Sequence, residues 1–294
     1  MSEEFRAVII GENFAESGTF SGGSWNASYP LANSQSRDFG VVSRSSNALA
    51  ASTIMKIDLG REEQIGGVAV CCINWSRTAT VRLMLSTFSD YSTLSYDTGF
   101  TYVPGFVVST SLLPSNHPDA DDGVLNRWLP DEIDKHYIHV ISEDDEADAW
   151  ARYVQIQISD TSNSDGYLEH GYVMVGAGLR PSINYGEGNG LTLTHLTDQA
   201  QSLGGQMNFN ERADVRSWAA GFRYLSNREL YGNAFRMKIK ARDSRPVVVV
   251  PDPTDTLNFQ VRSFVARMRE MSAIEQIVGM ADLGAVNFVF EEWK

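Results

Sequence analysis

The sequence has little cysteine and no long hydrophobic run. Its two cysteines, Cys71 and Cys72, are adjacent in an apolar stretch. Neighbouring side chains of a strand point to opposite faces, so a disulfide between them would be strained, and we interpret both as small buried residues. The longest apolar stretch, residues 65–73, is about half the length of a membrane span, which argues against membrane insertion. The acidic start, Met1–Arg6, lacks the basic and apolar segments of a secretory signal, so we expect no export.

Basic charge is also scarce. The chain of 294 residues has 37 acidic against 24 basic residues and a formal net charge of −13. Such a field repels phosphate backbones, so we expect no nucleic-acid partner. The hydrophobic fraction of 43% is large enough for a buried core, and at about 150 residues per domain the length favours two domains.

Motifs for catalysis and for metal binding are missing as well. His136 and His139 are three apart in an expected strand and so face opposite sides of the sheet. The glycines of residues 186–190 do not open a helix of a nucleotide-binding unit. The acidic run 143–148 is interpreted as a solvated loop. The run 119–123 has residues that could ligate calcium, but it lacks the full ligand spacing of a calcium loop. We therefore expect no enzyme activity, no metal and no cofactor.

Residues 5–180 are predicted to form a mostly β domain. Short apolar or alternating segments are separated there by turn-rich stretches, without three turns of helical periodicity. Residues 67–74 form a nearly continuous apolar run, which is typical of a strand buried on both faces. Residues 153–158 alternate most clearly. The expected strands are 53–60, 67–74, 80–86, 106–108, 137–141, 152–158 and 172–175.

The strongest break in the chain is the segment 181–190, with four glycine or proline residues, and it predicts a boundary between domains 1–180 and 181–294. The second part is predicted to be a smaller, β-rich α+β domain, with a short helix that begins at the capping box Ser226–Glu229 and buries Leu230, Ala234 and Met237. Its expected strands are 191–196, 212–224, with Val215 and Trp218 as anchors, 246–251, 259–271 and 285–290.

Two long polar loops, 24–46 and 114–134, contain the candidate ligand-binding residues. Loops of this length in a compact domain are usually functional or partly disordered. Flat rings there can serve as a platform for a sugar face, surrounded by directional hydrogen bonds. Alternatively, the rings fasten the loops to the sandwich. The candidates are Trp25, Tyr29, Arg37, Asn126 and Trp128.

The front part carries six segments in a fixed order: Trp25–Leu31, Ile57–Gly60, Ile65–Val68, Asn74, Thr80–Ser86 and Arg152–Ile156. In this order they resemble galactose-binding-like, discoidin-type jelly rolls, over residues 20–180. The resemblance implies a jelly-roll β-sandwich. Such domains often tie their ends with a disulfide, and this chain has no cysteine pair for one, which argues against extracellular lectin ancestry but not against the fold.

Further segments lie at Ile158–Asp160, Asn163–Gly171, the Gly176 turn, Tyr224–Ser226 and Pro246–Val249. They resemble tail proteins of long-tailed bacteriophages. The resemblance implies a structural component of the tail tip or baseplate, made in the host bacterial cytoplasm and located in the virion tail. Its implied partners are other phage tail proteins and copies of itself, in a ring, with host-surface carbohydrate as a further partner.

Two alternatives stay open. One is a stand-alone carbohydrate-binding module protein that uses the five candidate residues of the long loops. The other is a hydrolase with an unrecognised site, which would need paired carboxylates about 5–10 Å apart in a cleft.

Overall fold

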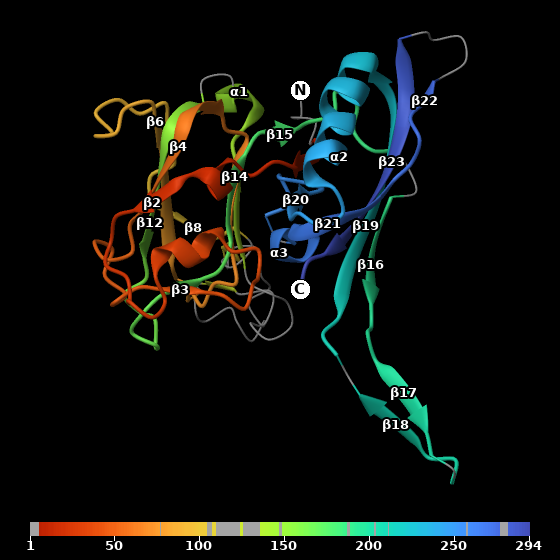
Figure 1. The fold of residues 1–294 in the computed structure, drawn as a ribbon, viewed down its shortest axis with the longest axis horizontal. Coiled ribbons are helices and arrows are strands. Elements are labelled where there is room, and N and C mark those ends of the chain that lie inside the picture. The colour runs from red at the N-terminus through yellow and green to blue at the C-terminus, as the bar shows by residue number, and fades with distance from the viewer. Residues whose placement is uncertain are drawn as a thin grey trace. The chain divides into compact units, whose positions relative to one another are not determined.

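The computed structural model describes residues 6–76, 78–104, 108–109, 124–125, 136–146, 149–186, 189–202, 204–210, 212–256, 258–276 and 282–294. The chain divides into two compact units (Figure 1). Unit 1 consists of Met1–Arg180 and Val250–Phe264, and unit 2 of Pro181–Val249 and Val265–Lys294. The segment 250–264, expected in the second domain, thus groups with unit 1. Within the described ranges, no helix is long and apolar enough to cross a membrane.

Unit 1 is built from two antiparallel sheets. The larger has the order β2 (Thr19–Ser21), β4 (Met55–Gln64), β12 (Trp150–Ser159), β6 (Thr80–Ser86) and β7 (Tyr96–Asp97), and β8 (Thr101–Tyr102) also pairs with β6. The smaller has the order β11 (His136–Val140), β5 (Gly67–Cys71) and β14 (Val173–Gly176). This architecture confirms the prediction of a mostly β fold with a sandwich in the front part.

The core of unit 1 follows from strand alternation. Val154 of β12 pairs with Ile57 of β4 on one side and with Leu85 of β6 on the other, and all three are buried. Val68 and Val70 of β5 belong to the same core cluster. All five residues of β5 are buried, so the predicted strand covered on both faces is confirmed.

The remaining elements of unit 1 are short. They are β1 (Val8–Ile10), η1 (Phe14–Ser17), η2 (Leu31–Gln35), β3 (Ser43–Arg44), β9 (Val108–Ser109), β10 (Val124–Leu125), α1 (Glu143–Glu146), β13 (Glu169–His170), β15 (Gly178–Leu179) and α3 (Phe259–Arg262). Two predictions were wrong here. Within the acidic run 143–148, residues Glu143–Glu146 form the helical turn α1 instead of a loop, with Ser142 as the hydrogen-bond partner of Asp145. The expected strand 259–271 begins with α3, because the Gln260 amide donates to the carbonyls of Pro104 and His136, both at 2.8 Å.

Unit 2 has one main sheet. Its order is β20 (Val247–Val250), β21 (Phe264–Met271), β23 (Leu283–Glu292), β19 (Val215–Ser226) and β16 (Gly190–Thr194), and β22 (Glu275–Gln276) also pairs with β23. The strands from β21 to β16 pair antiparallel. Trp218 and Phe222 of β19 lie on the same face as Phe288 and Phe290 of β23, with the Trp218 and Phe290 rings stacked 5.8 Å apart. This aromatic layer is buried.

A helix covers the sheet of unit 2. It consists of the π-helical segment η5 (Arg228–Phe235) and α2 (Arg236–Ala241). Its predicted capping box is confirmed, because the Ser226 amide donates to Glu229 Oε2 at 3.0 Å and the Glu229 amide donates to Ser226 Oγ at 3.3 Å. The predicted inner stripe, which includes Leu230, is buried. Position 284 of β23 requires glycine, because a Cβ there would lie 2.6 Å from the backbone oxygen of Glu275 and 2.7 Å from Leu230 Cδ1.

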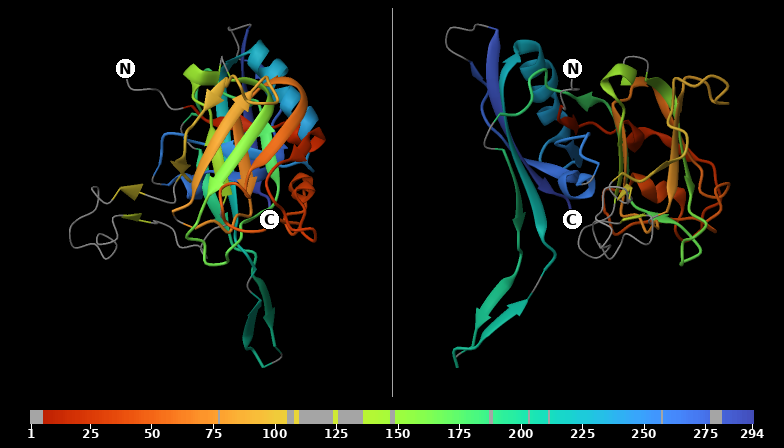
Figure 2. Two further views of the ribbon diagram at one scale, coloured as in Figure 1. Left: turned by 90° about the vertical axis from the view of Figure 1, so that its left-hand side faces the viewer. Right: turned by 180° about the vertical axis from the view of Figure 1, so that it is seen from behind.

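A two-stranded ribbon extends from this sheet. Among the described residues, β17 (Asp198–Gln201) and β18 (Met207–Asn210) pair only with each other, and they continue the hairpin formed by β16 and β19 (Figure 2). We call residues 190–214 the arm.

Candidate ligand-binding rim

Three loops of unit 1 meet at one end of the sandwich. Strand register places them there, because the end of β12 lies beside the start of β6 on one side and near the start of β4 on the other. The end of β5 lies beside the starts of β11 and β14. The loops 22–54, 72–79 and 160–172 therefore come from the same end.

A cation sandwiched between two rings lies on these loops. β3 pairs with β13 so that Arg44 is directly opposite Glu169, and Arg44 Nε donates to Glu169 Oε1 at 2.6 Å. The guanidinium carbon lies 4.4 Å from the ring centre of Tyr29 and 4.2 Å from that of Tyr167. Stacking and ion pairing fix the planar guanidinium in one orientation. The hydrogen bond to Glu169 raises the pKa of Arg44, so its charge is secured.

Asn74 connects the loops that carry these groups. Its side-chain nitrogen donates to Asp165 Oδ2 at 2.9 Å and to the Tyr167 carbonyl at 3.2 Å, and its oxygen accepts from the Glu169 amide at 2.7 Å. One side chain thus holds three positions of the loop 160–172. The rim is defined here as Tyr29, Arg44, Asn74, Asp165, Tyr167 and Glu169.

The layer beneath the rim is buried and neutral. His170 follows Glu169 in β13 and so points to the opposite face, where its Nε2 lies 2.9 Å from Ser34 Oγ and its ring lies edge-on to Trp25 at 5.1 Å. Burial lowers the pKa of His170 to about 3, so the imidazole is uncharged at neutral pH. Gly23 lets Trp25 reach this place, because a Cβ at its φ of +62° would lie 2.6 Å from the carbonyl oxygens of Ser52 and Ile54.

The five predicted site residues have different places. Tyr29 is on the rim, with 38% of its surface exposed. Trp25 fastens its loop, since Nε1 donates to the Gly22 carbonyl at 2.9 Å and the ring packs against the core. Arg37 forms a bidentate ion pair with Glu16, which also accepts from the Tyr172 hydroxyl at 2.7 Å. Asn126 and Trp128 lie outside the described residues.

Sequence reasoning missed Arg44 and Tyr167 as partners of Tyr29. Arg44 lies in the same predicted loop, 24–46, as Tyr29, and Tyr167 lies in the loop that follows β12, so these two loops could have indicated them. The segment 163–170, dense in polar and aromatic residues, follows the clearest strand of the chain.

A separate pocket of about 590 Å³ lies beside β7. Tyr96 and His139 line it, with the Tyr96 hydroxyl 2.9 Å from His139 Nε2, and burial lowers the pKa of His139 to about 4. Asp97 and Asp145 also line it, but Arg82 forms two hydrogen bonds to Asp97 and lowers its pKa. A general acid needs the opposite shift, so this pair does not support the hydrolase alternative.

Metal ligands do not gather in the described parts of the chain. No three histidine, cysteine, aspartate or glutamate side chains of those residues lie close enough together to hold an ion. The acidic run 119–123 lies outside the described residues.

Comparisons with known proteins find similarity only to solved structures. No protein-family model matches the chain, and no curated protein matches it. The structure is similar to CBM32-1 of a family 31 glycoside hydrolase from Clostridium perfringens, with 12% identity and a TM-score of 0.33 over 56% of this chain and 98% of that chain. It is also similar to the family 32 CBM of C. perfringens NanJ in complex with galactose, with 13% identity and a TM-score of 0.35 over 57% and 98%.

A fucolectin from striped bass (Morone saxatilis) serum is a further neighbour, with 16% identity and a TM-score of 0.35 over 59% of this chain and 50% of that chain. All three similarities are weak in identity and in TM-score. The assignment of the sandwich therefore rests on the strand order and register of this chain itself.

Proposed function

We propose that the protein is a carbohydrate-binding protein and that the rim is its binding surface. The observation that carries the proposal is the position of Arg44 between the rings of Tyr29 and Tyr167, with Tyr29 still partly exposed. A binding site needs apolar faces with a few fixed polar groups, and a sugar offers a C–H face and a ring of hydroxyls to such an arrangement. The rim has both in a preorganised form.

Charge favours a neutral, hydroxyl-rich ligand over an anionic one. The rim contains one cation, Arg44, against the carboxylates of Asp165 and Glu169. The whole chain has a net charge of −13, which repels phosphate groups. Arg44 supplies donors, and the carboxylates of Asp165 and Glu169 supply acceptors, as a set of hydroxyl groups requires.

The test is a glycan array with the full chain, followed by calorimetric titration of any glycan that binds. We expect Tyr29→Ala to weaken binding by at least about tenfold, because a contact worth about 1.4 kcal/mol or more is lost. Arg44→Lys should weaken it too, because a lysine cannot present the planar donor set. Tyr102→Ala is the matched control, since Tyr102 is an exposed tyrosine on β8. No binding at millimolar sugar, or equal loss in the control, would overturn the proposal.

A second candidate is supported by the arm. We propose that the chain is a structural component of a bacteriophage tail tip or baseplate, made in the bacterial cytoplasm and located in the virion tail, with residues 1–180 binding and residues 181–294 assembling. Leu193 and Phe209 on the arm are more than half exposed, and apolar surface of this kind marks protein contacts. Mass spectrometry and immunogold electron microscopy of purified virions should find several copies at the tail tip. Virions without the chain would contradict this role.

A further inference from the structure

The helix of unit 2 has two apolar stripes on different faces. The inner stripe, at Leu230, Ala234, Met237 and Ala241, is buried. The outer stripe, at Tyr231, Phe235 and Ile239, has the spacing of four residues that places side chains on one helix face, and each is about half exposed or more. A helix at a protein surface usually has only the first kind of stripe. The outer stripe therefore indicates a docking surface.

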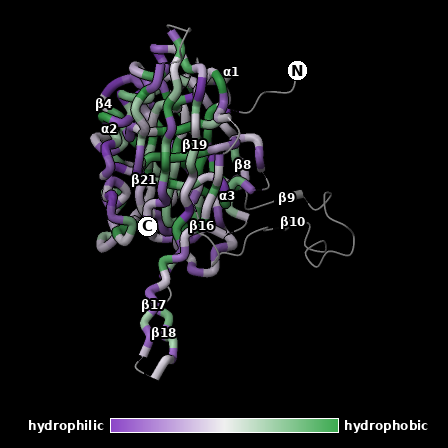
Figure 3. Tube along the Cα trace, turned by 90° about the vertical axis from the view of Figure 1, so that its right-hand side faces the viewer, coloured by the Kyte–Doolittle hydropathy of each residue, from purple (hydrophilic) through white to green (hydrophobic). Residues whose placement is uncertain are grey.

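The arm exposes a second apolar surface. Leu191 and Leu193 of β16 lie opposite Trp218 and Arg216, on the face of the sheet that buries Trp218, yet both leucines are more than 40% exposed. Met207 and Phe209 share one face of β18 and are exposed as well. In Figure 3, the tube that extends from β16 into β17 and β18 contains green, hydrophobic segments. A two-stranded hairpin is marginally stable alone, so this ribbon gains from a partner.

The two surfaces have opposite charge. Arm residues 190–214 contain Asp198, Glu211 and Asp214 against Arg212, a net charge of −2. Segment 228–245 of the helix and its end has six basic residues against Glu229 and Asp243, a net charge of +4 in a chain whose total is −13. The six are Arg228, Arg236, Lys238, Lys240, Arg242 and Arg245. Complementary charge of this kind fixes partner choice and register.

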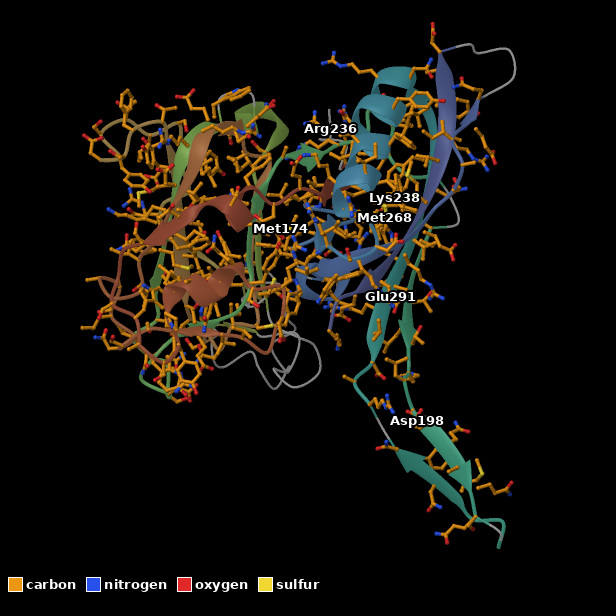
Figure 4. All side chains as sticks on the ribbon, in the orientation of Figure 1. Met174, Asp198, Arg236, Lys238, Met268 and Glu291 are labelled. Atoms are coloured by element: carbon orange, nitrogen blue, oxygen red, sulfur yellow. The ribbon has the colours of Figure 1, made fainter. Side chains whose placement is uncertain are left out.

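The arm cannot reach the outer stripe of its own helix. β17 and β18 lie at one end of unit 2, whereas η5 and α2 lie toward the other, as two views agree (Figures 1 and 2). Figure 4 labels Asp198 on the arm, far along the ribbon from Arg236 and Lys238 on the helix. The acidic, apolar arm must therefore find its basic, apolar counterpart on another molecule.

We propose that the arm of one copy packs on the outer stripe of a second copy, with Phe209 and Phe235 in the contact. Each copy then offers one donor surface and one acceptor surface. Such a heterologous contact builds a ring if the rotation closes and a filament if it does not. The inference deepens the assembly role proposed above and rests on it.

The experiment is sedimentation velocity of the purified full chain over a series of concentrations. The wild-type chain should associate as its concentration rises, and Phe209→Glu on the arm or Phe235→Glu on the helix should each weaken association by at least about tenfold. The decisive sample is the mixture of the two variants, because each retains one intact surface. It should form a dimer that does not grow further. Phe88→Glu is the control, as Phe88 is an exposed phenylalanine of unit 1.

Association that survives both variants, or a mixture that stays monomeric although both variants are folded by circular dichroism, would overturn the proposal. If a variant does not fold, hydrogen exchange of the wild-type chain decides instead. Amides of β17, β18 and α2 should become protected together as concentration rises, and no change in them refutes the contact. A chain that associates in this way but is missing from virions refutes only the tail role, whereas a virion component that never associates alone refutes only this contact.

Discussion

The rim of unit 1 and the arm of unit 2 differ in how far their side chains find partners within the chain. On the rim, each charged or amide side chain is held by a neighbour, as Arg44 is by Glu169 and Asn74 is by Asp165. On the arm, apolar residues such as Phe209 are exposed, and β17 and β18 form a two-stranded sheet of their own. The rim is complete within one chain, which suits a small ligand. The arm is incomplete, which suits a protein partner.

Two ion pairs of unit 2 differ in a similar way, because one is buried in the sheet and the other is exposed on the arm. Arg216 and Glu292 join neighbouring parts of the sheet with side chains only 5% and 4% exposed, and the Arg216 amide also donates to Glu292 Oε2 at 3.0 Å. Arg212 and Asp198 join the two sides of the arm with side chains 61% and 63% exposed. Geometry is similar, but the surroundings differ, so the energetic consequences should differ as well.

The largest effect is expected at the buried pair. Glu292→Gln removes the carboxylate that compensates the buried Arg216 guanidinium, and loss of one partner of such a pair costs about 3–5 kcal/mol. Hydrogen exchange of the β19 and β23 amides should report this loss in the free energy of opening. The double variant Arg216→Met and Glu292→Leu should recover most of it, because no charge is then buried. If the β19 and β23 amides of Glu292→Gln exchanged as slowly as those of the wild-type chain, the buried and the exposed ion pair would not differ in their contribution to stability.

A medium effect is expected from pH in unit 1. The pKa of His170 is lowered to about 3 in the folded state, so between pH 6.5 and pH 3 the unfolded chain binds a proton that the folded chain does not. The contribution of His170 to the free energy of unfolding is therefore fully present above about pH 6.5. It decreases as the pH falls, and the loss from this residue alone is about 2 kcal/mol at pH 5.

Urea unfolding of the wild-type chain and of His170→Gln at pH 7 and pH 5 measures this difference. Glutamine keeps a partner for Ser34 but does not titrate in this range. The variant should lose less stability than the wild-type chain on acidification, whatever its stability at pH 7. Equal losses in the two proteins would show that the buried imidazole does not couple to folding.

The sequence carried the regular strands and the helix start, because their signals are local. Alternating residues predicted β6 at its observed bounds, and Ser226 and Glu229 predicted the capping box that forms. The rim could not be read in the same way. Arg44 and Glu169 are 125 residues apart, and they meet because two strands of two residues each, too short for any periodicity, pair in one register.

The arm shows a different limit of sequence reasoning. Alternation in residues 191–196 predicted a strand, and β16 forms there. The same alternation implies that Leu191 and Leu193 face a core, and they do lie on the face of Trp218. Whether that face is covered depends on contacts that alternation within one strand does not encode.

The smallest effect is expected at the exposed pair of the arm. Asp198→Asn removes the carboxylate that pairs with Arg212, but water solvates both groups, so the free energy of unfolding should change by about 0.5 kcal/mol or less in the isolated chain. Thermal unfolding at low concentration checks this, with Asp243→Asn as an exposed control that pairs with Lys238.

Association gives the sharper readout, because Asp198 contributes to the negative charge that would meet the basic helix of a second copy. The variant should therefore associate more slowly than wild type at low salt and similarly at high salt, where charge is screened. If Asp198→Asn lowered the free energy of unfolding as much as Glu292→Gln, the arm would be stabilised within one chain and would not need a partner.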